Sequence, residues 1–424
     1  MEALGARLAL DPTSIAAGLT PDPTGTATAL AFVLGGVALG TVSGLVPGLH
    51  VNNLALLLAS VAPAVPGPPR LVGAAMLAAG VVHSFLDAVP ALALGVPDAA
   101  MAATALPGHR LVIAGRGREA VRLSALGSGL AVALAVPLAV PVTEGMTVAY
   151  PTVRAHLPLV LGSAVAFLLL TEGTLRAVAG GLAGFVGSGA LGYATLDLSP
   201  AAPLDAGGML TPLFAGLFGA PVLVEALSGS GVPEQDDGAI AVSRRTVAVT
   251  ALAGSLAGAV VGYLPGVSAA VAAVVALAFV PGSTGARGFV VTTSGVNTAN
   301  TIFALFALAA LGAPRTGVMV ALQETRAPVN LPLLLASAGL AGVAGFVLVL
   351  GLGDRYLRIV GSLDNARLSV GVLALLAGLS WLFAGGVGVA IFGVSALVGL
   401  VPVQFGARRV HLMGVLLGPL ILGA

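Results

Sequence analysis

Long apolar segments alternate with short polar ones along nearly the whole chain of 424 residues. A bilayer core of ~30 Å needs roughly 20 residues of helix, so the length allows roughly ten to twelve spans plus shorter re-entrant pieces. The pattern predicts an all-α polytopic membrane protein with multiple passes through the cell membrane. The apolar segments run over 28–46, 48–64, 71–95, 120–142, 155–171, 174–195, 208–230, 246–264, 266–281, 288–312, 328–352, 367–384, 386–402 and 408–423.

Two polar interruptions organise the chain. Residues 108–122 carry four Arg, and residues 231–245 read "GVPEQDDGAIAVSRR". We therefore predict a polar N-terminal lead-in at 1–27, a first membrane repeat at 28–230, a polar inter-repeat loop at 231–245 and a second membrane repeat at 246–424.

The two halves share a sequence repeat. "GTVSGLVPGLH" from Gly40 matches "GAVVGYLPGVS" from Gly258, with four Gly and Pro positions in common at an offset of 218. Further on, His83 aligns with Asn300, and "LGVP" aligns with "LGAP" at an offset of 217. Duplicated halves with Pro- and Gly-interrupted segments at corresponding positions are typical of secondary transporters.

The distribution of Arg predicts that the repeats are inverted. Arg7 is the one basic residue before the first repeat, whereas Arg244 and Arg245 directly precede the second. By the positive-inside rule the first repeat starts outside and the second inside. The same rule predicts that 108–122 and 231–245 are cytoplasmic.

Each Pro-Gly pair interrupts an apolar segment and predicts half of a substrate site. Non-helical backbone at membrane depth is tolerated where it lines a cavity, and the amides of a helix that begins there attract anions. We expect the two breaks to face each other near the bilayer midplane. The alternative is a Pro kink between packed helices. The substrate-binding candidates are Pro47, Gly48, Asn52, Asn53, Pro265, Gly266 and Ser268.

A second polar cluster, "TTSGVNTANTIF", lies at 292–303 inside an apolar run. Asn297 and Asn300 are three residues apart and are predicted to share a helix face. We add them and Ser294 to the substrate-binding candidates. The alternative is hydrogen bonding between packed helices.

Ionisable residues inside spans are candidates for coupling an ion gradient. His83 and Asp87 are separated by one helical turn, and Asp98 follows near a predicted helix end. His83 and Asp87 supply only two possible metal ligands, which is too few to predict a metal site. An intramembrane enzyme built on His50, His83 and Asp87 is an alternative interpretation. No nucleophile motif supports it, so we do not expect an enzyme.

Composition narrows the classes of function. The chain is 58% hydrophobic and 8% charged, and its 18 basic residues are all Arg. Without Lys there is no Walker A motif, so transport is expected to follow a gradient. The absence of Cys excludes disulfides, and a net charge of +1 gives no case for nucleic acid. Because 43–60, 80–100 and 260–282 contain no Arg, we expect an anion to be held by helix N-termini, with co-transported Na⁺ or H⁺ and no other cofactor.

Several stretches resemble the large membrane subunit of tripartite tricarboxylate transporters, the TctA family, and its archaeal-type branch in particular. They include "GLVPGLHVNN", "ATALPGHRLVIAGRGREAVRLSALGS" and "TSGVNTANTIFALFALAALGAPRTGVMVAL". The resemblance implies a permease for small organic anions such as di- or tricarboxylates, with a small membrane subunit and an extracytoplasmic binding protein. Pro107 replaces the acid in the bacterial "TALDG", and "LGVPD" replaces an Asn-Thr-Pro-Gly type turn, which separates this chain from the bacterial pattern.

The sequence leaves a second class of function open. A polyprenyl-phosphate or other lipid-phosphate flippase also fits broken helices and an anion site. A polar groove open to lipid would favour the flippase, and a cavity closed to lipid would favour the permease. A homo-oligomer is compatible with the sequence in either case.

Overall fold

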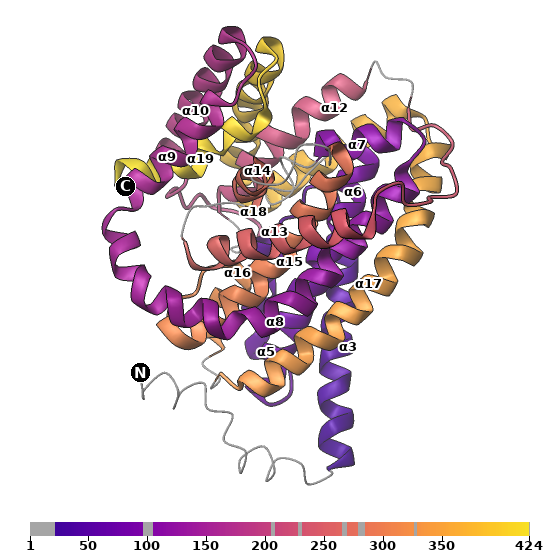
Figure 1. Ribbon diagram of the computed structural model, residues 1–424, viewed down its shortest axis with the longest axis vertical. Helices are drawn as coiled ribbons and strands as arrows, with labels where there is room; N and C mark the ends of the chain where they lie inside the picture. Colours follow the sequence, from indigo (N-terminus) through magenta and orange to yellow (C-terminus); the bar gives the residue numbers. More distant parts are fainter. Residues whose placement is uncertain are drawn as a thin grey trace.

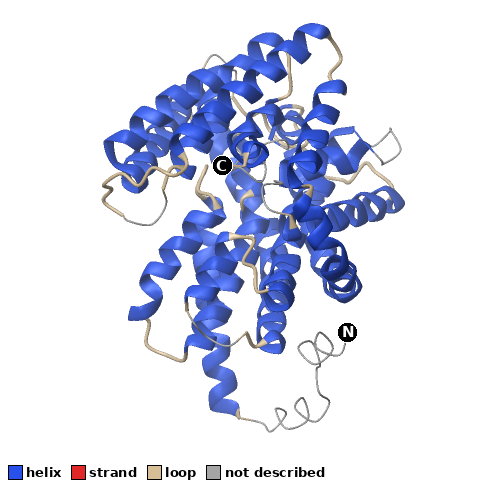
Figure 2. Ribbon diagram, turned by 90° about the vertical axis from the view of Figure 1, so that its left-hand side faces the viewer, coloured by secondary structure: helices blue, strands red, loops and turns tan. Residues whose placement is uncertain are grey.

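A computed structural model describes residues 22–95, 105–204, 208–227, 231–264, 269–278, 285–325 and 329–423. This part of the chain is helical and contains no β-strand (Figure 2). In chain order the elements are α3 (Pro23–Leu45), α4 (Val51–Val61), η1 (Ala62–Ala64), α5 (Pro69–Leu86), α6 (Ala88–Leu94), α7 (Ala105–Ile113), α8 (Gly117–Ala155), α9 (Leu157–Leu170), α10 (Leu175–Thr195), α11 (Leu210–Phe214), η2 (Ala215–Gly219), α12 (Ala220–Ala226), α13 (Arg244–Tyr263), α14 (Ala269–Ala278), α15 (Gly285–Leu311), α16 (Gly317–Glu324), α17 (Leu331–Ser362), α18 (Asn365–Phe405), η3 (Arg409–Met413) and α19 (Gly414–Leu422).

Eight helices of the described chain are long and apolar enough to cross a membrane, and four shorter apolar helices accompany them. The all-α membrane architecture predicted from the sequence is confirmed. Within the described ranges the long helices number eight, because four of the apolar segments form shorter helices and segments 367–384 and 386–402 together form α18. At ~1.5 Å per residue the 41 residues of α18 would extend about 60 Å. A kink at Ala384 and Gly385, where φ is −144° and 59°, divides this helix in two.

The break in the first repeat is longer than the sequence suggests. We expected a new helix to begin near Gly48, but α3 ends at Leu45 and α4 begins at Val51. Gly48 has a φ of 73°, a conformation that favours glycine, and it turns the chain between the two helices. His50 caps α4 because its Nδ1 accepts a hydrogen bond from the amide of Asn52 at 3.0 Å.

A second interruption lies inside the span Pro69–Leu94. Asp87 separates α5 from α6. Pro90 has no amide hydrogen, so it cannot donate to the carbonyl of Leu86, and this missing bond explains why the helix is interrupted here. The interruption places the Asp87 side chain, 4% exposed, inside the bundle.

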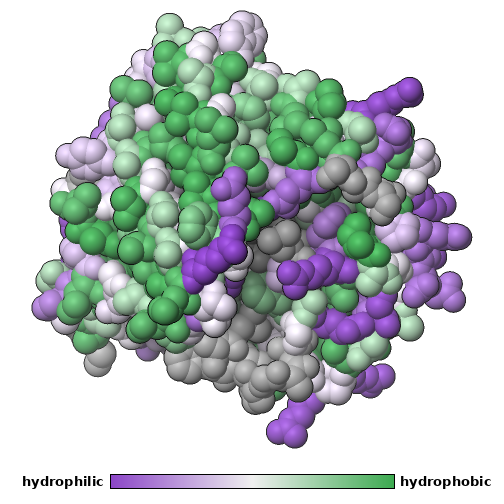
Figure 3. Space-filling model, turned by 90° about the horizontal axis from the view of Figure 1, so that it is seen from above, coloured by the Kyte–Doolittle hydropathy of each residue, from purple (hydrophilic) through white to green (hydrophobic). Residues whose placement is uncertain are grey.

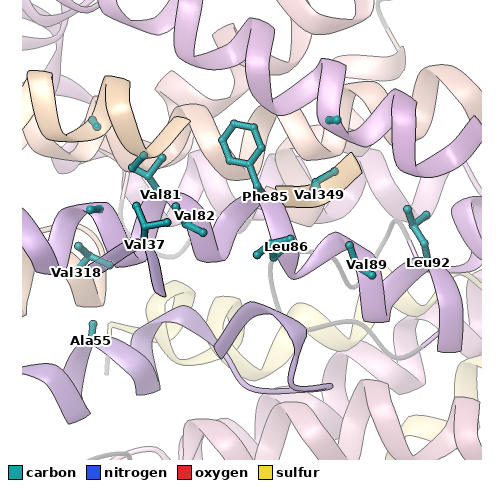
Figure 4. Close-up of a cluster of buried hydrophobic side chains, with 14 of the residues drawn as sticks. Val37, Ala55, Val81, Val82, Phe85, Leu86, Val89, Leu92, Val318 and Val349 are labelled. Carbon is teal, nitrogen blue, oxygen red and sulfur yellow. The ribbon is translucent and has the colours of Figure 1, made fainter. Parts of the chain in front are cut away.

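The main hydrophobic core forms where α5 is enclosed by other helices. The span Pro69–Leu94 is the most deeply buried of the eight. Phe85 and Leu86 of α5 belong to one buried cluster with Val37 of α3, Val318 of α16 and Val349 of α17 (Figure 4). Burying α5 on all sides positions its few polar groups away from lipid.

A separate hydrophobic cluster joins α9, η2 and α19, and α9, α10 and α19 lie together at the top left of Figure 1. Its edge holds the buried carboxylate of Glu172, which accepts hydrogen bonds from Arg408 Nε at 2.8 Å and His411 Nε2 at 2.7 Å. Burial alone would raise the pKa of Glu172, but the hydrogen bonds from these two residues outweigh it, so the pKa is lowered. The carboxylate therefore remains ionised and ties the α9–α10 turn to η3.

The two halves repeat the same close helix contact. A Cβ on Gly40 of α3 would lie 2.3 Å from the carbonyl oxygen of Ala79 on α5. A Cβ on Gly258 of α13 would lie 2.9 Å from the carbonyl oxygen of Val296 on α15, which is 217 positions after Ala79. Two further pairs of contacts are related by the same offsets. Gly36 lies against Ala75 as Gly254 lies against Thr292, and Gly44 lies against Leu86 as Gly262 lies against Phe303. Small residues let membrane helices approach closely, and here they build one helix pair in each half. That the halves are inverted stays a prediction.

The two polar interruptions lie against each other. Residues 231–243 have no helix or strand and cover the turn between α7 and α8. Arg118 and Arg122 donate to the carbonyls of Asp236 and Gly238, and Glu119 accepts from the amide of Ala241 at 2.7 Å. In Figure 3 hydrophilic residues gather along one edge of the molecule while hydrophobic residues cover much of the rest of that face. Both segments are therefore on the same side of the protein; the cytoplasmic assignment stays a prediction.

Candidate polar pocket between the two halves

A polar pocket of about 270 Å³ lies where helices of both halves meet. This volume is near the lower limit of the ~300–1,000 Å³ that is usual for ligand pockets, so its occupant must be small. Apolar residues from α11, α13, α14 and α19 form part of the wall. The polar lining consists of His50, Asn52, Ser84, Asn297, Asn300, Thr301, Arg315 and Thr316.

The first half supplies the N-terminus of α4. His50 stacks on Phe214 with ring centroids 6.1 Å apart, which fixes the imidazole at the pocket wall. Asn52 Oδ1 accepts a hydrogen bond from the amide of Gly317 at 2.9 Å. Because Gly317 is the first residue of α16, this bond joins the broken segment of the first half to the start of a helix in the second.

The second half supplies one face of α15. Asn297 and Asn300 both line the pocket, so the shared helix face predicted from their spacing is confirmed. Asn297 Nδ2 also donates to Asp87 Oδ2 at 2.7 Å and to the carbonyl of Ser84 at 3.3 Å. Asn300 Oδ1 is buried and has no hydrogen-bond partner within the described ranges. Asn297 thus connects the pocket to the interruption of α5, and Asn300 presents an acceptor to an occupant.

The predicted ion-coupling residues lie behind the pocket wall. His83 and Asp87 are buried, and neither lines the pocket. His83 Nδ1 is 2.9 Å from Ser43 Oγ on α3, so it connects α5 to α3. In the described chain no three His, Asp or Glu side chains are grouped as a metal would require. Their coupling role stays a prediction.

Several predicted substrate residues point elsewhere. Pro47 and Gly48 do not line the pocket; a Cβ on Gly48 would lie 2.4 Å from Leu376 of α18. Asn53 is buried and donates to Thr211 Oγ1 of α11. Ser294 Oγ is 2.9 Å from Ser124 Oγ, so Ser294 faces α8. Pro47 and Gly48 precede the N-terminus of α4 at the pocket, whereas Asn53 and Ser294 lie on helix faces that pack against α11 and α8.

Four of the predicted site residues, Pro265, Gly266, Ser268 and Asp98, lie outside the described residues. Leu264 and Ala269, which flank the first three, both line the pocket. The flanks of the second break and the N-terminus of α4 after the first break therefore reach one cavity.

The pocket has a basic side chain that is not among the predicted site residues, and the prediction that helix N-termini hold an anion stays a prediction. Arg315 lines the pocket from the segment between α15 and α16. Arg315 lies outside the Arg-free stretches 43–60, 80–100 and 260–282, and it follows the turn at Gly312, where φ is 65°. The sequence did hold a signal, since "LGAPR" is the repeat partner of "LGVPD" and marks another helix end.

The described residues form an all-helical bundle with eight candidate membrane spans and a pocket lined from both halves, which defines a multi-pass membrane protein. Comparison with protein families agrees and is more specific. The model of the tripartite tricarboxylate transporter TctA family matches residues 30–414. The chain belongs to the TctA family, as the resemblance of its motifs implied.

One similar protein comes from an archaeon. The uncharacterized protein MJ1079 of Methanocaldococcus jannaschii is 26% identical over 363 residues, covering 80% of this chain and 84% of its own length. This similarity is consistent with the archaeal-type branch. No solved structure matches the chain.

Proposed function

We propose that this protein is a gradient-driven permease for small organic anions and that the polar pocket is its substrate site. The family is named for tricarboxylate transport, which supports carboxylates as the substrate class. The pocket is small, it combines polar and apolar side chains, and both halves of the chain line it. A site between two halves suits alternating access, because movement of one half against the other opens it to either side.

One observation carries the ion-driven part of the proposal. Asn297 lines the pocket, and its amide nitrogen donates to the buried carboxylate of Asp87 at 2.7 Å. A Na⁺ or H⁺ bound at Asp87 would weaken this bond, because both compete for the same carboxylate oxygen. The amide would then be released toward the substrate, so ion and anion would bind with positive coupling.

The same family name supports partner subunits. We propose that the chain works with a small membrane subunit and an extracytoplasmic binding protein, as a tripartite system does. Copurification with candidate subunits, compared with uptake by the isolated chain, tests this proposal.

Uptake into proteoliposomes tests the transport function. Purified protein is reconstituted, Na⁺ or H⁺ gradients are imposed, and uptake of labelled succinate and citrate is measured. We expect wild-type uptake that depends on one gradient, no uptake with Asn300→Leu, and weakened or uncoupled uptake with Asp87→Asn. Gln404→Leu is the matched control, because Gln404 is an exposed amide at the end of α18.

Two outcomes would contradict the proposal. Wild-type protein that moves no carboxylate under any gradient removes the permease function. Wild-type rates with unchanged ion dependence in both variants would leave the function intact, but would identify Asn300 and Asp87 as residues that only hold helices together.

A lipid-phosphate flippase is the second candidate, and one observation favours it. An apolar groove of about 460 Å³ lies between α9, α13 and α14, and every described residue that lines it is apolar. Leu264 lines both this groove and the polar pocket. An acyl or prenyl chain in the groove could therefore place its phosphate in the pocket.

A bulky residue in the groove separates the two candidates. Leu256 lies on its wall and is 45% exposed. With Leu256→Trp we expect carboxylate uptake to continue, since the substituted side chain is not part of the polar pocket. Transport of a fluorescent lipid phosphate by the wild type, blocked by this variant, would favour the flippase instead.

A further inference from the structure

One residue that lines the pocket, Arg315, carries a positive charge that the proposed coupling through Asn297 and Asp87 does not use. Arg315 lies between the end of α15 and the start of α16 and is partly buried. Thr316, the next residue, caps α16 by accepting a hydrogen bond from the amide of Met319 at 3.3 Å. The cap fixes the backbone directly after Arg315, so the Arg315 side chain starts from a fixed position at the pocket wall.

An aromatic side chain from the first half holds the guanidinium. Arg315 donates to the hydroxyl of Tyr150 near the end of α8, and its Cζ lies 5.0 Å from the centroid of the Tyr150 ring. A guanidinium stacked on an aromatic face keeps its charge and can still donate in its own plane. Tyr150 therefore orients Arg315 without neutralising it.

Among the described residues, no carboxylate balances the charge of Arg315. None of the ion pairs found in the described ranges includes Arg315. Its Nε is buried and has no hydrogen-bond partner there. A buried guanidinium N–H without an acceptor is unfavourable, so the geometry calls for an acceptor supplied by the occupant of the pocket.

We propose that Arg315 binds one carboxylate of the substrate and that Tyr150 is the residue that positions it. This inference rests on the proposed permease function and names its charge-selecting residue. A carboxylate can accept from Nε and a terminal nitrogen together, in the paired geometry that guanidinium groups favour. The other polar lining groups include the neutral amides of Asn52, Asn297 and Asn300, which suit a hydroxyl or a second carboxyl group. The substrate class is thus a small carboxylate with at least one further polar group.

Uptake and binding by variants of Arg315 test the assignment. We expect Arg315→Gln to raise the KM for succinate about ten- to a hundredfold, the range for losing a charge-assisted bond. The KM of Arg315→Lys should lie between those of the wild type and Arg315→Gln, because an ammonium keeps the charge but loses the planar pair of donors. Tyr150→Phe keeps the ring and removes the hydroxyl, so we expect a higher KM with little change in kcat.

Arg176 provides the matched control. It also lies over an aromatic ring, with its Cζ 5.9 Å from the centroid of Phe405, but it is exposed and does not line the pocket. Arg176→Gln should leave the KM unchanged. Thermal stabilisation of the purified proteins by succinate, with inorganic phosphate as the comparison, gives a readout independent of transport. We expect succinate to stabilise the wild type and not Arg315→Gln.

The outcomes separate this inference from the function on which it rests. If the wild type transports and binds no carboxylate, the proposed function fails and the assignment of Arg315 fails with it. If the wild type transports succinate and Arg315→Gln has the same KM, the permease stands and Arg315 is not its carboxylate ligand. If Arg315→Gln does not fold, unchanged KM values for both Arg315→Lys and Tyr150→Phe overturn the assignment.

Discussion

Glu119 is the residue whose replacement should destabilise the fold most clearly. It is fully buried near the start of α8 and accepts four hydrogen bonds. Oε1 accepts from Arg287 Nε at 2.7 Å and the amide of Ala241 at 2.7 Å. Oε2 accepts from Arg116 Nε at 2.6 Å and from a terminal nitrogen of Arg287 at 3.0 Å. One carboxylate therefore joins α8, α15 and the loop before α13.

The effect of Glu119→Gln can be worked from this geometry. Glutamine keeps the volume but has a single acceptor oxygen, so at least two of the four donors lose their partner. Hydrogen bonds to charged groups contribute ~1.5–3 kcal/mol each. The side chains of Arg116 and Arg287 are 34% and 26% exposed, so water replaces part of what they lose. We expect the free energy of unfolding to fall by about 2–3 kcal/mol, roughly a thirty- to 150-fold change in the unfolding equilibrium.

The assay is unfolding in mixed micelles with increasing SDS, followed by circular dichroism. Glu234→Gln is the control, because Glu234 belongs to the same loop and is exposed. A loss for Glu119→Gln no larger than that of the control would refute the reasoning. It would mean that the loop before α13 is held by its backbone bonds to Arg118 and Arg122 and not by the buried carboxylate.

Two further predictions concern packing and pH. Gly40→Val should remove the folded monomer peak in detergent size-exclusion chromatography, because a Cβ there would lie 2.3 Å from the carbonyl oxygen of Ala79. Gly35→Val on the same helix is the control and should elute as wild type, because a Cβ there meets nothing within 4 Å. Gly258→Val should lose the peak as Gly40→Val does, and normal elution of either variant would contradict the repeated contact. Glu172 has a folded pKa below its usual 4.5, so its contribution to stability is full above that value and is lost as pH falls through the folded pKa. Melting curves should show Glu172→Gln less stable than wild type at pH 7 and the difference shrinking below pH 4.5, and a difference independent of pH would argue against the ionised carboxylate.

The class of fold and three of the eight polar residues that line the pocket could be predicted from the sequence. Apolar length gives membrane helices, and the spacing of Asn297 and Asn300 gives their shared face. The rest depends on contacts between distant segments, which local patterns do not contain. Arg315 reads as a solvated loop residue until α8 brings Tyr150 to it. Ser294 lies in the same polar run as the two Asn, but its hydroxyl faces α8, and only the packing of the bundle decides that.

The glycines that pack α3 on α5 and α13 on α15 also limit how the gene can change. Every amino-acid replacement of glycine adds at least a Cβ, and at Gly36, Gly40 and Gly44 that atom has no room. The same holds at their counterparts Gly254, Gly258 and Gly262. Residues facing lipid can drift among apolar types without such a clash. After a duplication, the two copies would therefore keep their likeness at these close contacts while positions that face lipid diverge.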